Sequence, residues 1–130
     1  MSDKASPAET LRSAAALMRE RANAASPGPW HEMCLGSEGC SVLNDGRLRE
    51  RKHVSFSGRK EWKADHADAE YIAGMSPLVG LALADWLDKE AERAGELSGY
   101  EDSAAYPLML SGYRHPLAVA RAFLGEAPGA

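Results

Sequence analysis

Apolar residues recur at helical spacing near the start of the chain, directly after a helix-start signal. Ser6 can cap a helix, Pro7 suits the first helical position, and Glu9 completes the S-x-x-E pattern of a capping box. The helix cannot continue through residues 26–29, which contain two prolines and a glycine. The apolar face of the predicted helix comprises Leu11, Ala14, Ala15, Met18 and Ala22.

The helical period is lost between residues 30 and 56, where short strand-like runs alternate with turn residues. Residues 35–39 are turn-like, and Asn44-Asp45-Gly46 is typical of a hairpin. The pattern therefore predicts a small antiparallel sheet. Its expected strands are Trp30 to Cys34, Cys40 to Leu43 and Arg47 to Phe56.

Helical spacing returns at Asp65, which we expect to cap the next helix. Its apolar face is expected to carry Tyr71, Ile72 and Met75. Ser76-Pro77 then repeats the start signal of the first helix and opens the most apolar segment of the chain.

In that apolar helix we expect Leu83, Trp86 and Leu87 to be buried, and Asp88 to Arg93 to form a solvent-facing end. Residues 95–115 show no pattern that assigns an element. Pro116 is expected to open a last short helix over Leu117 to Leu124.

These elements predict an α+β fold: an N-terminal helix, a small antiparallel β-sheet, two consecutive helices and a short C-terminal helix. A chain of 130 residues fits one domain, with residues 1–5 and 126–130 as tails. Alanine and glycine inflate the 45% hydrophobic content, and 7% of residues are aromatic, so the core is expected to be small. We therefore predict a homo-oligomer. Leu117, Phe123 and Leu124 fit either its interface or the core of their own domain.

The overall charge is acidic, with a net charge of −4 and a pI of about 5.5. This charge disfavours bulk attraction to nucleic acid or to an anionic membrane. No apolar run approaches the roughly 18 residues of a membrane span, and the N-terminus lacks the layout of a signal peptide. With two cysteines as well, the expected location is the cytoplasm.

Basic residues are nevertheless concentrated in residues 47–63, which hold seven Lys/Arg and two Asp/Glu. The local net charge is +5, which leaves −9 for the rest of the chain. Strand alternation would place Arg47, Arg49, Arg51 and His53 on one face. Guanidinium groups donate bidentate hydrogen bonds to phosphate oxygens, so this row predicts a phosphorylated, nucleotide-type ligand. The alternative is a solvated edge strand whose cations prevent aggregation.

Two further residues are candidates for ligand binding. Trp30 follows a rigid Pro-Gly-Pro turn and could stack on a ligand, or it could be buried and lock the turn onto the helices. Arg114 lies in a segment from Tyr106 to His115 that is rich in aromatic and basic groups, which are common binding equipment on loops.

A mixed Cys/His zinc site is a further alternative, built from His31, Cys34 and Cys40 with His53 or His66. The spacing is not that of a standard zinc finger and no CxxC is present, so two ordinary thiols on a hairpin explain the pattern equally. Asp65, His66, Asp68 and Glu70 also fall within about two helical turns, where helix capping and a solvated face account for them. We therefore expect no metal site.

Two segments together resemble a known group of proteins. One is Ser26-Pro27-Gly28-Pro29-Trp30 after an Ala-rich helix; the other is Asp68-Ala69-Glu70-Tyr71-Ile72-Ala73, followed by Ser76-Pro77 and a Leu/Ala-rich helix. This layout resembles the Ead-like accessory proteins of lambdoid temperate phages and uncharacterised proteins of actinobacteria and their phages. The resemblance implies a phage or prophage setting, a host-interaction role and self-association, and it supplies no catalytic residues.

The function predicted from these observations is that of a non-enzymatic accessory protein that binds a small phosphorylated ligand, in the host cytoplasm if it is phage-encoded. A protein–protein interaction module that contacts an acidic host protein is the alternative. A small metal-dependent enzyme is the third interpretation, although no GxSxG, HExxH, Walker or GxGxxG motif is present. We expect no cofactor.

Overall fold

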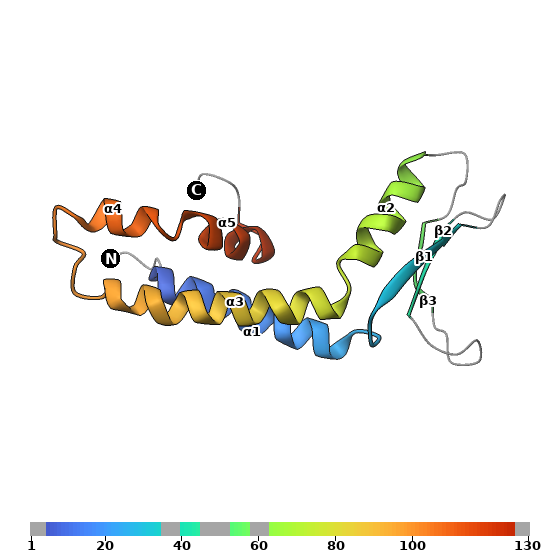
Figure 1. Cartoon of the computed structure of the whole chain (residues 1–130), viewed down its shortest axis with the longest axis horizontal. Coiled ribbons are helices and arrows are strands. Elements are labelled where there is room, and N and C mark those ends of the chain that lie inside the picture. Colours follow the sequence, from blue (N-terminus) through green and yellow to red (C-terminus); the bar gives the residue numbers. More distant parts are fainter. Residues whose placement is uncertain (1–4, 35–39, 45–52, 58–62, 127–130) are drawn as a thin grey trace. The chain divides into compact units, whose positions relative to one another are not determined.

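The computed structural model describes residues 5–34, 40–44, 53–57 and 63–126. These residues form helices and a short antiparallel sheet (Figure 1). This confirms the predicted α+β class. The elements in chain order are α1 (Pro7–Ala24), β1 (Trp30–Cys34), β2 (Cys40–Asn44), β3 (His53–Ser57), α2 (Lys63–Gly74), α3 (Pro77–Ala94), the 3-10 helix η2 (Gly95–Leu97), α4 (Tyr106–Ser111) and α5 (Arg114–Phe123).

The chain is organised into two compact units. The helical unit contains residues 1–19 and 82–130, and the sheet unit contains residues 20–81. Helices α1 and α3 contribute residues to both units, so the boundary falls inside these two helices. That the whole chain forms one domain stays a prediction.

Helix α1 begins at the capping box that the sequence predicts. The Glu9 backbone N–H donates to Ser6 Oγ, and the Ser6 N–H donates to Glu9 Oε2. The donor–acceptor distance is 3.2 Å in both hydrogen bonds. The backbone N–H groups of these two residues have no partner within the helix. Each is thereby satisfied by the side chain of the other residue. The start of α1 is therefore determined by a local sequence signal.

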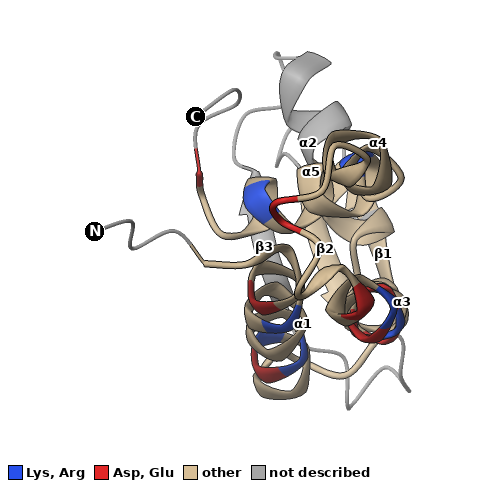
Figure 2. Cartoon of the chain, turned by 90° about the vertical axis from the view of Figure 1, so that its left-hand side faces the viewer, with Lys and Arg blue, Asp and Glu red and all other residues tan. Residues whose placement is uncertain are grey.

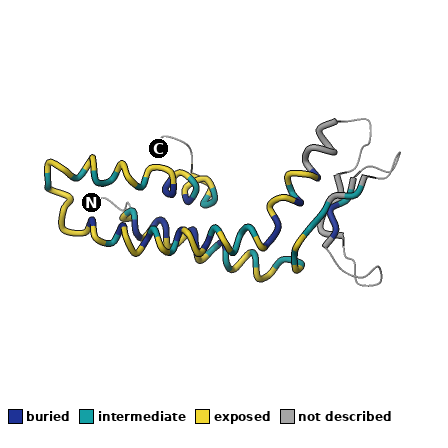
Figure 3. The backbone as a smooth tube through the Cα atoms, in the orientation of Figure 1, coloured by how far each residue is buried: buried dark blue, intermediate teal, exposed yellow. Residues whose placement is uncertain are grey.

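The core of the helical unit is a row of small and aliphatic side chains between α1 and α3. Because alanine projects only a methyl group, two helix faces lined with it can approach closely. Leu117 and Ala120 of α5 join the same cluster. The buried residues from the two long helices are Ala8, Leu11, Ala14, Ala15 and Met18 of α1, and Ala84, Leu87, Ala91 and Ala94 of α3 (Figure 3).

Three expectations about apolar positions in this unit are corrected or resolved. Trp86 is 37% exposed, and Leu83 is half-buried against the core, whereas Leu87 is fully buried as expected. The end of α3 is also not entirely solvent-facing, since Ala91 is buried within it. The buried stripe of α3 passes through alanines, and bulkier side chains lie at its margins. The sequence allows Leu117 either in an oligomer interface or in the core of its own domain. The structure places it in the core of the helical unit.

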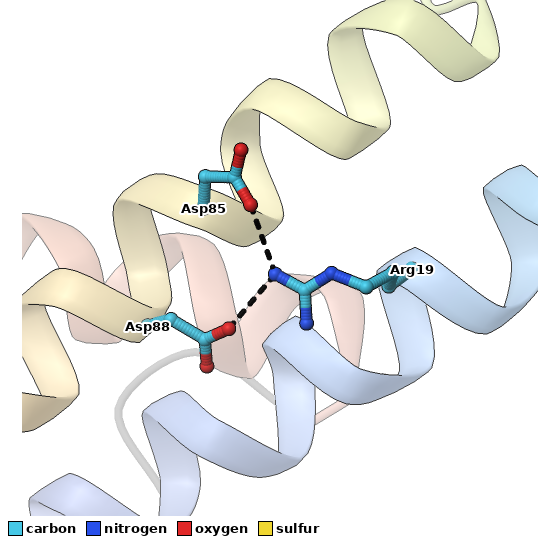
Figure 4. A network of polar contacts seen from close by, with 3 residues as sticks. All are labelled: Arg19, Asp85 and Asp88. Carbon is cyan, nitrogen blue, oxygen red and sulfur yellow. Dashed lines mark hydrogen bonds and ion pairs between the residues drawn. The ribbon is translucent and has the colours of Figure 1, made fainter.

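Charged residues recur along both long helices (Figure 2), and all of them are exposed or half-buried. Arg19 of α1 lies between two carboxylates of α3 (Figure 4), with Nη2 2.8 Å from Asp88 Oδ2 and 3.1 Å from Asp85 Oδ1. The hydrogen bond to Asp88, and then that to Asp85, raise the pKa of Arg19 above its ordinary value. An arginine is already fully protonated, so this contact orients the helices without making them pH-sensitive through Arg19.

The sheet unit is a three-stranded antiparallel sheet in the order β1-β2-β3, and α2 packs on it. Val42 of β2 is buried against Ala69 and Ala73 of α2, with Trp30 and Ile72 partly buried around them. The ladder between β2 and β3 is irregular between Val42 and Leu43. As in the helical unit, alanines on the helix provide the close contact.

The core-facing side of α2 differs from the expected one. Ala69 and Ala73 are buried and Ile72 is half-buried, whereas Tyr71 is 72% exposed and Met75 is also exposed. The buried face is therefore about one residue away from the predicted face. The sequence pattern assigns burial to the large side chains of α2, whereas the sheet packs against its alanines.

Element boundaries also differ from the expected ones. Helix α2 begins at Lys63, so Asp65 lies inside its first turn and is not the cap. Strand β3 begins at His53, and residues 47–52 of the expected strand lie outside the described residues. Helix α5 begins at Arg114, which places Pro116 in its first turn, where a missing N–H costs no helical hydrogen bond.

The stretch from residue 95 to 115, unassigned by sequence, contains η2 and α4. These elements span 3 and 6 residues. Such lengths are too short to establish a hydrophobic period. No helix among the described residues is both long and apolar enough to cross a bilayer.

The alanine-lined core predicts a strong dependence on its few large side chains. Replacing the fully buried Leu87 with alanine should lower the free energy of unfolding by about 2–5 kcal/mol, because it leaves a cavity that alanine neighbours cannot fill. Chemical denaturation measures the change. Leu108→Ala, at a side chain that is 78% exposed, is the control and should change stability by less than about 0.5 kcal/mol. Equal effects of the two variants would contradict the core described above.

The capping box predicts a second, smaller effect. Ser6→Ala should lower the free energy of unfolding by about 0.5–2 kcal/mol, because the Glu9 N–H loses its acceptor. Ser13→Ala makes the same chemical change at an exposed position inside α1 and should be neutral or slightly stabilising. Thermal and urea denaturation of both variants separate the two cases. Equal changes in the free energy of unfolding for the two variants would show that the cap does not stabilise the protein.

Candidate functional site

The candidate ligand-binding region is one end of the sheet, where the basic segment leaves and re-enters it. The chain leaves β2 at Asn44 and returns at His53, the first residue of β3. Trp30 lies opposite Asn44, and His53 lies opposite Leu43. We define this as the Trp30 end of the sheet. In the chain, residues 45–52 connect Asn44 of β2 to His53 of β3.

The three arginines of the predicted phosphate site, Arg47, Arg49 and Arg51, lie outside the described residues. Their connection to the fold is nevertheless defined, because the segment that holds them joins two neighbouring antiparallel strands. His53 marks the point at which that segment meets β3. Of this row the structure describes only His53, which lies at the Trp30 end of the sheet.

The rest of the basic cluster follows the other end of the same strand. Residues 58–62 connect β3 to α2 and include Arg59 and Lys60, and α2 opens with Lys63. β3 is an edge strand, with β2 on one side and no further strand in the described sheet on the other. The sequence therefore carries basic residues before and after an edge strand.

Trp30 is held by the turn that precedes it. Its indole Nε1 donates to the Ser26 carbonyl oxygen over 2.9 Å, which closes the turn through Pro27-Gly28-Pro29. The ring also packs at the border of the cluster formed by Val42, Ala69 and Ala73, and it is half-buried. These contacts give Trp30 a structural role, since it ties the preceding turn to the core of the sheet unit. Its role in binding a ligand stays a prediction.

The same turn packs closely against the start of α3. A Cβ on Gly28 would lie 3.2 Å from Pro77 Cδ and 3.3 Å from Ser76 Cβ, tighter than most carbon contacts. Glycine at this position therefore allows the turn and the helix start to touch. Ser76 and Pro77 are both buried.

Arg114, the remaining predicted ligand-binding residue, lies in the helical unit. It is the first residue of α5 and is exposed, with Nη2 3.5 Å from His115 Nε2. The other five predicted residues belong to the sheet unit. Trp30 and His53 thus lie at the same end of the sheet, whereas Arg114 belongs to the helical unit.

The possible zinc ligands do not converge on one face of the sheet. Cys34 and Cys40 occupy the same register position on β1 and β2, whereas His31 lies opposite Leu43. Residues three apart on a strand belong to opposite faces, so His31 is placed on the other face from Cys34. Within the described parts of the chain, no group of three or more His, Cys, Asp or Glu residues is placed to hold a metal ion.

Exposed apolar residues near the junction of α2 and α3 were not predicted as a surface feature. Tyr71, Met75 and Leu78 are all exposed in the sheet unit. Sequence periodicity assigned Tyr71 and Met75 to a buried face, so no signal in the sequence marked them as surface residues. Isolated exposed apolar side chains are common, and these three define no ligand chemistry.

Comparison with known proteins provides no family assignment. The chain matches no protein-family model, no curated protein and no solved structure. The resemblance to phage accessory proteins therefore stays a prediction.

Proposed function

We propose that this chain is a non-enzymatic binding protein whose basic segment, residues 47–63, binds a small phosphorylated ligand of the nucleotide type. The observation that carries the proposal is charge segregation: a local net charge of +5 within a chain whose remainder is −9. Solubility does not require this separation, since mixed surface charges serve that purpose better. A concentrated cationic segment is suited to a concentrated anionic ligand.

The sheet supports this proposal by the way it connects the basic residues. Both ends of segment 45–52 are anchored in hydrogen-bonded strands, at Asn44 and at His53. An anchored segment loses less conformational entropy on binding than a free tail, so its guanidinium groups bind at a smaller cost. Arginine is also the side chain best matched to phosphate, because its planar fork donates two parallel hydrogen bonds.

A small ligand fits the charge distribution better than an extended nucleic acid does. A long polyanion would also approach the acidic remainder of the chain, which repels it. The helical unit alone carries ten Asp/Glu against seven Lys/Arg, a net charge of −3. A small ligand can bind the basic segment without extending over these acidic residues. The proposed setting is a phage or prophage accessory role in the host cytoplasm, following the sequence resemblance.

Binding of an acidic protein is the second candidate function, and it is favoured by a different observation. β3 is an edge strand with basic residues before and after it in the chain. An edge strand can accept an additional strand from a partner through backbone hydrogen bonds. An acidic extended peptide would then satisfy both the strand edge and the flanking charges.

Isothermal titration calorimetry with mono-, di- and cyclic nucleotides tests the first proposal. A charge-assisted contact to phosphate contributes roughly 1.5–3 kcal/mol, so Arg49→Ala should weaken binding about tenfold or more with the fold intact. Affinity should also fall as the salt concentration rises, because the contact is ionic. A bound ligand should raise the melting temperature of the native protein.

Lys89→Ala is the matched control, because it removes one exposed cation from α3 in the helical unit. It should leave the affinity unchanged. The phosphate proposal is overturned if no nucleotide binds more tightly than about millimolar, or if both variants lose affinity equally. Binding of an acidic peptide that Arg49→Ala weakens, with no response to nucleotides, would favour the protein-partner function instead.

A further inference from the structure

The two cysteines of the chain lie directly opposite each other on neighbouring strands. Cys34 is the last residue of β1, Cys40 is the first residue of β2, and the two form the final pair of the antiparallel ladder. The register places Glu32 opposite Val42 and Met33 opposite Ser41 before that pair is reached. Sequence spacing alone had left these residues as ordinary thiols or zinc ligands.

Backbone geometry makes this position suitable for a covalent link. Directly opposed residues in an antiparallel sheet have Cα atoms about 4.5 or 5.5 Å apart, depending on whether the pair is hydrogen-bonded. Disulfides span Cα distances of about 4.4–6.8 Å. The Cα separation of either kind of pair therefore falls within the range that disulfides span.

We propose that Cys34 and Cys40 form a reversible cross-strand disulfide, so that the end of the β1–β2 hairpin is a thiol–disulfide exchange site. The co-reactant is a low-molecular-weight disulfide such as oxidised glutathione. One cysteine thiolate attacks that disulfide, forms a mixed disulfide and releases one small thiolate. The second cysteine thiolate attacks the protein sulfur of the mixed disulfide and releases the other small thiolate. The protein loses two electrons and two protons, and the small disulfide is reduced to two thiols.

The structural consequence is local. The link lies at the same end of the sheet as Ser57, which pairs with Cys40 from the other side. Oxidation therefore fastens β1 to β2 at the end of the ladder, where hydrogen-bonded strands otherwise fray most readily. Since the register already places the two positions directly opposite each other, oxidation should leave the fold unchanged and raise its melting temperature.

The test is equilibration of the folded full chain with glutathione buffers, followed by acid quenching, alkylation and intact-mass measurement. The native protein should lose two hydrogens and carry neither alkyl groups nor glutathione once oxidised. Cys34→Ser and Cys40→Ser should each stop at one glutathione adduct, because the resolving thiol is absent. A non-reducing gel should show that the link lies within one chain.

The contribution of the register is measured by repeating the equilibration in urea, where only the short loop brings the thiols together. The equilibrium constant for closing the disulfide should be at least tenfold larger in the native state, which corresponds to about 30 mV for a two-electron couple. An equal constant in both states would overturn the proposal, and so would a native protein that accumulates two glutathione adducts.

A register-shifted variant provides the matched control. Cys34→Ser combined with Met33→Cys keeps two thiols but places one of them opposite Ser41, on the other face from Cys40. This variant should need at least tenfold more oxidised glutathione to close. Cys40→Ser combined with Ser41→Cys makes the corresponding shift on β2 and replaces the first variant if that one fails to fold. Closure of both shifted pairs at the native ratio would contradict a register-defined site.

Discussion

The close approach of two alanine-lined helix faces is the contact on which the helical unit depends. Within this unit α1 and α3 run antiparallel, since Arg19 contacts Asp85 while Arg12 Nη2 would lie 3.8 Å from a Cβ on Gly95. Of the core residues on these helices, only Leu11, Met18 and Leu87 carry large side chains. Small side chains contribute little transfer free energy each, so stability depends on many close contacts and a few well-placed leucines.

The sheet unit applies the same principle to a helix on a sheet. Alanines on α2 allow its backbone to approach Val42, while the partly buried Trp30 fills the border of the contact. Trp30 is itself positioned by its hydrogen bond to Ser26, which ties the turn to the first strand. A rigid turn and one aromatic side chain thus connect the end of α1 to the sheet on which the candidate site lies.

The distribution of charge complements this packing. The cores are small, their described buried residues include no charged side chain, and Asp85 and Asp88 hold Arg19 on the surface of the helical unit. The excess of cations is confined to segments that leave and enter the sheet around β3. Charge changes around β3 would test the proposed binding without altering the buried residues of either core.

Features that depend on neighbouring residues could be predicted from the sequence. The capping box at Ser6 and Glu9, the turn after residue 26 and the helix start after Ser76 all rest on interactions within a few positions. The strands were visible as short strand-like runs separated by turn residues. The basic segment is likewise visible in the sequence, because net charge is a property of composition. Short elements such as α4 could not be predicted, since 6 residues do not display a period.

The buried faces of the helices and the pairing of strand positions could not be predicted from the sequence and are defined by the tertiary structure. Trp86 and Tyr71 were expected in cores and are exposed, because their helices turn alanines toward their partners instead. The pairing of Trp30 with Asn44, and of Cys34 with Cys40, follows from strand register. Burial and register depend on hydrogen bonds and packing between segments distant in sequence, and local side-chain pattern carries no information about the partner's shape.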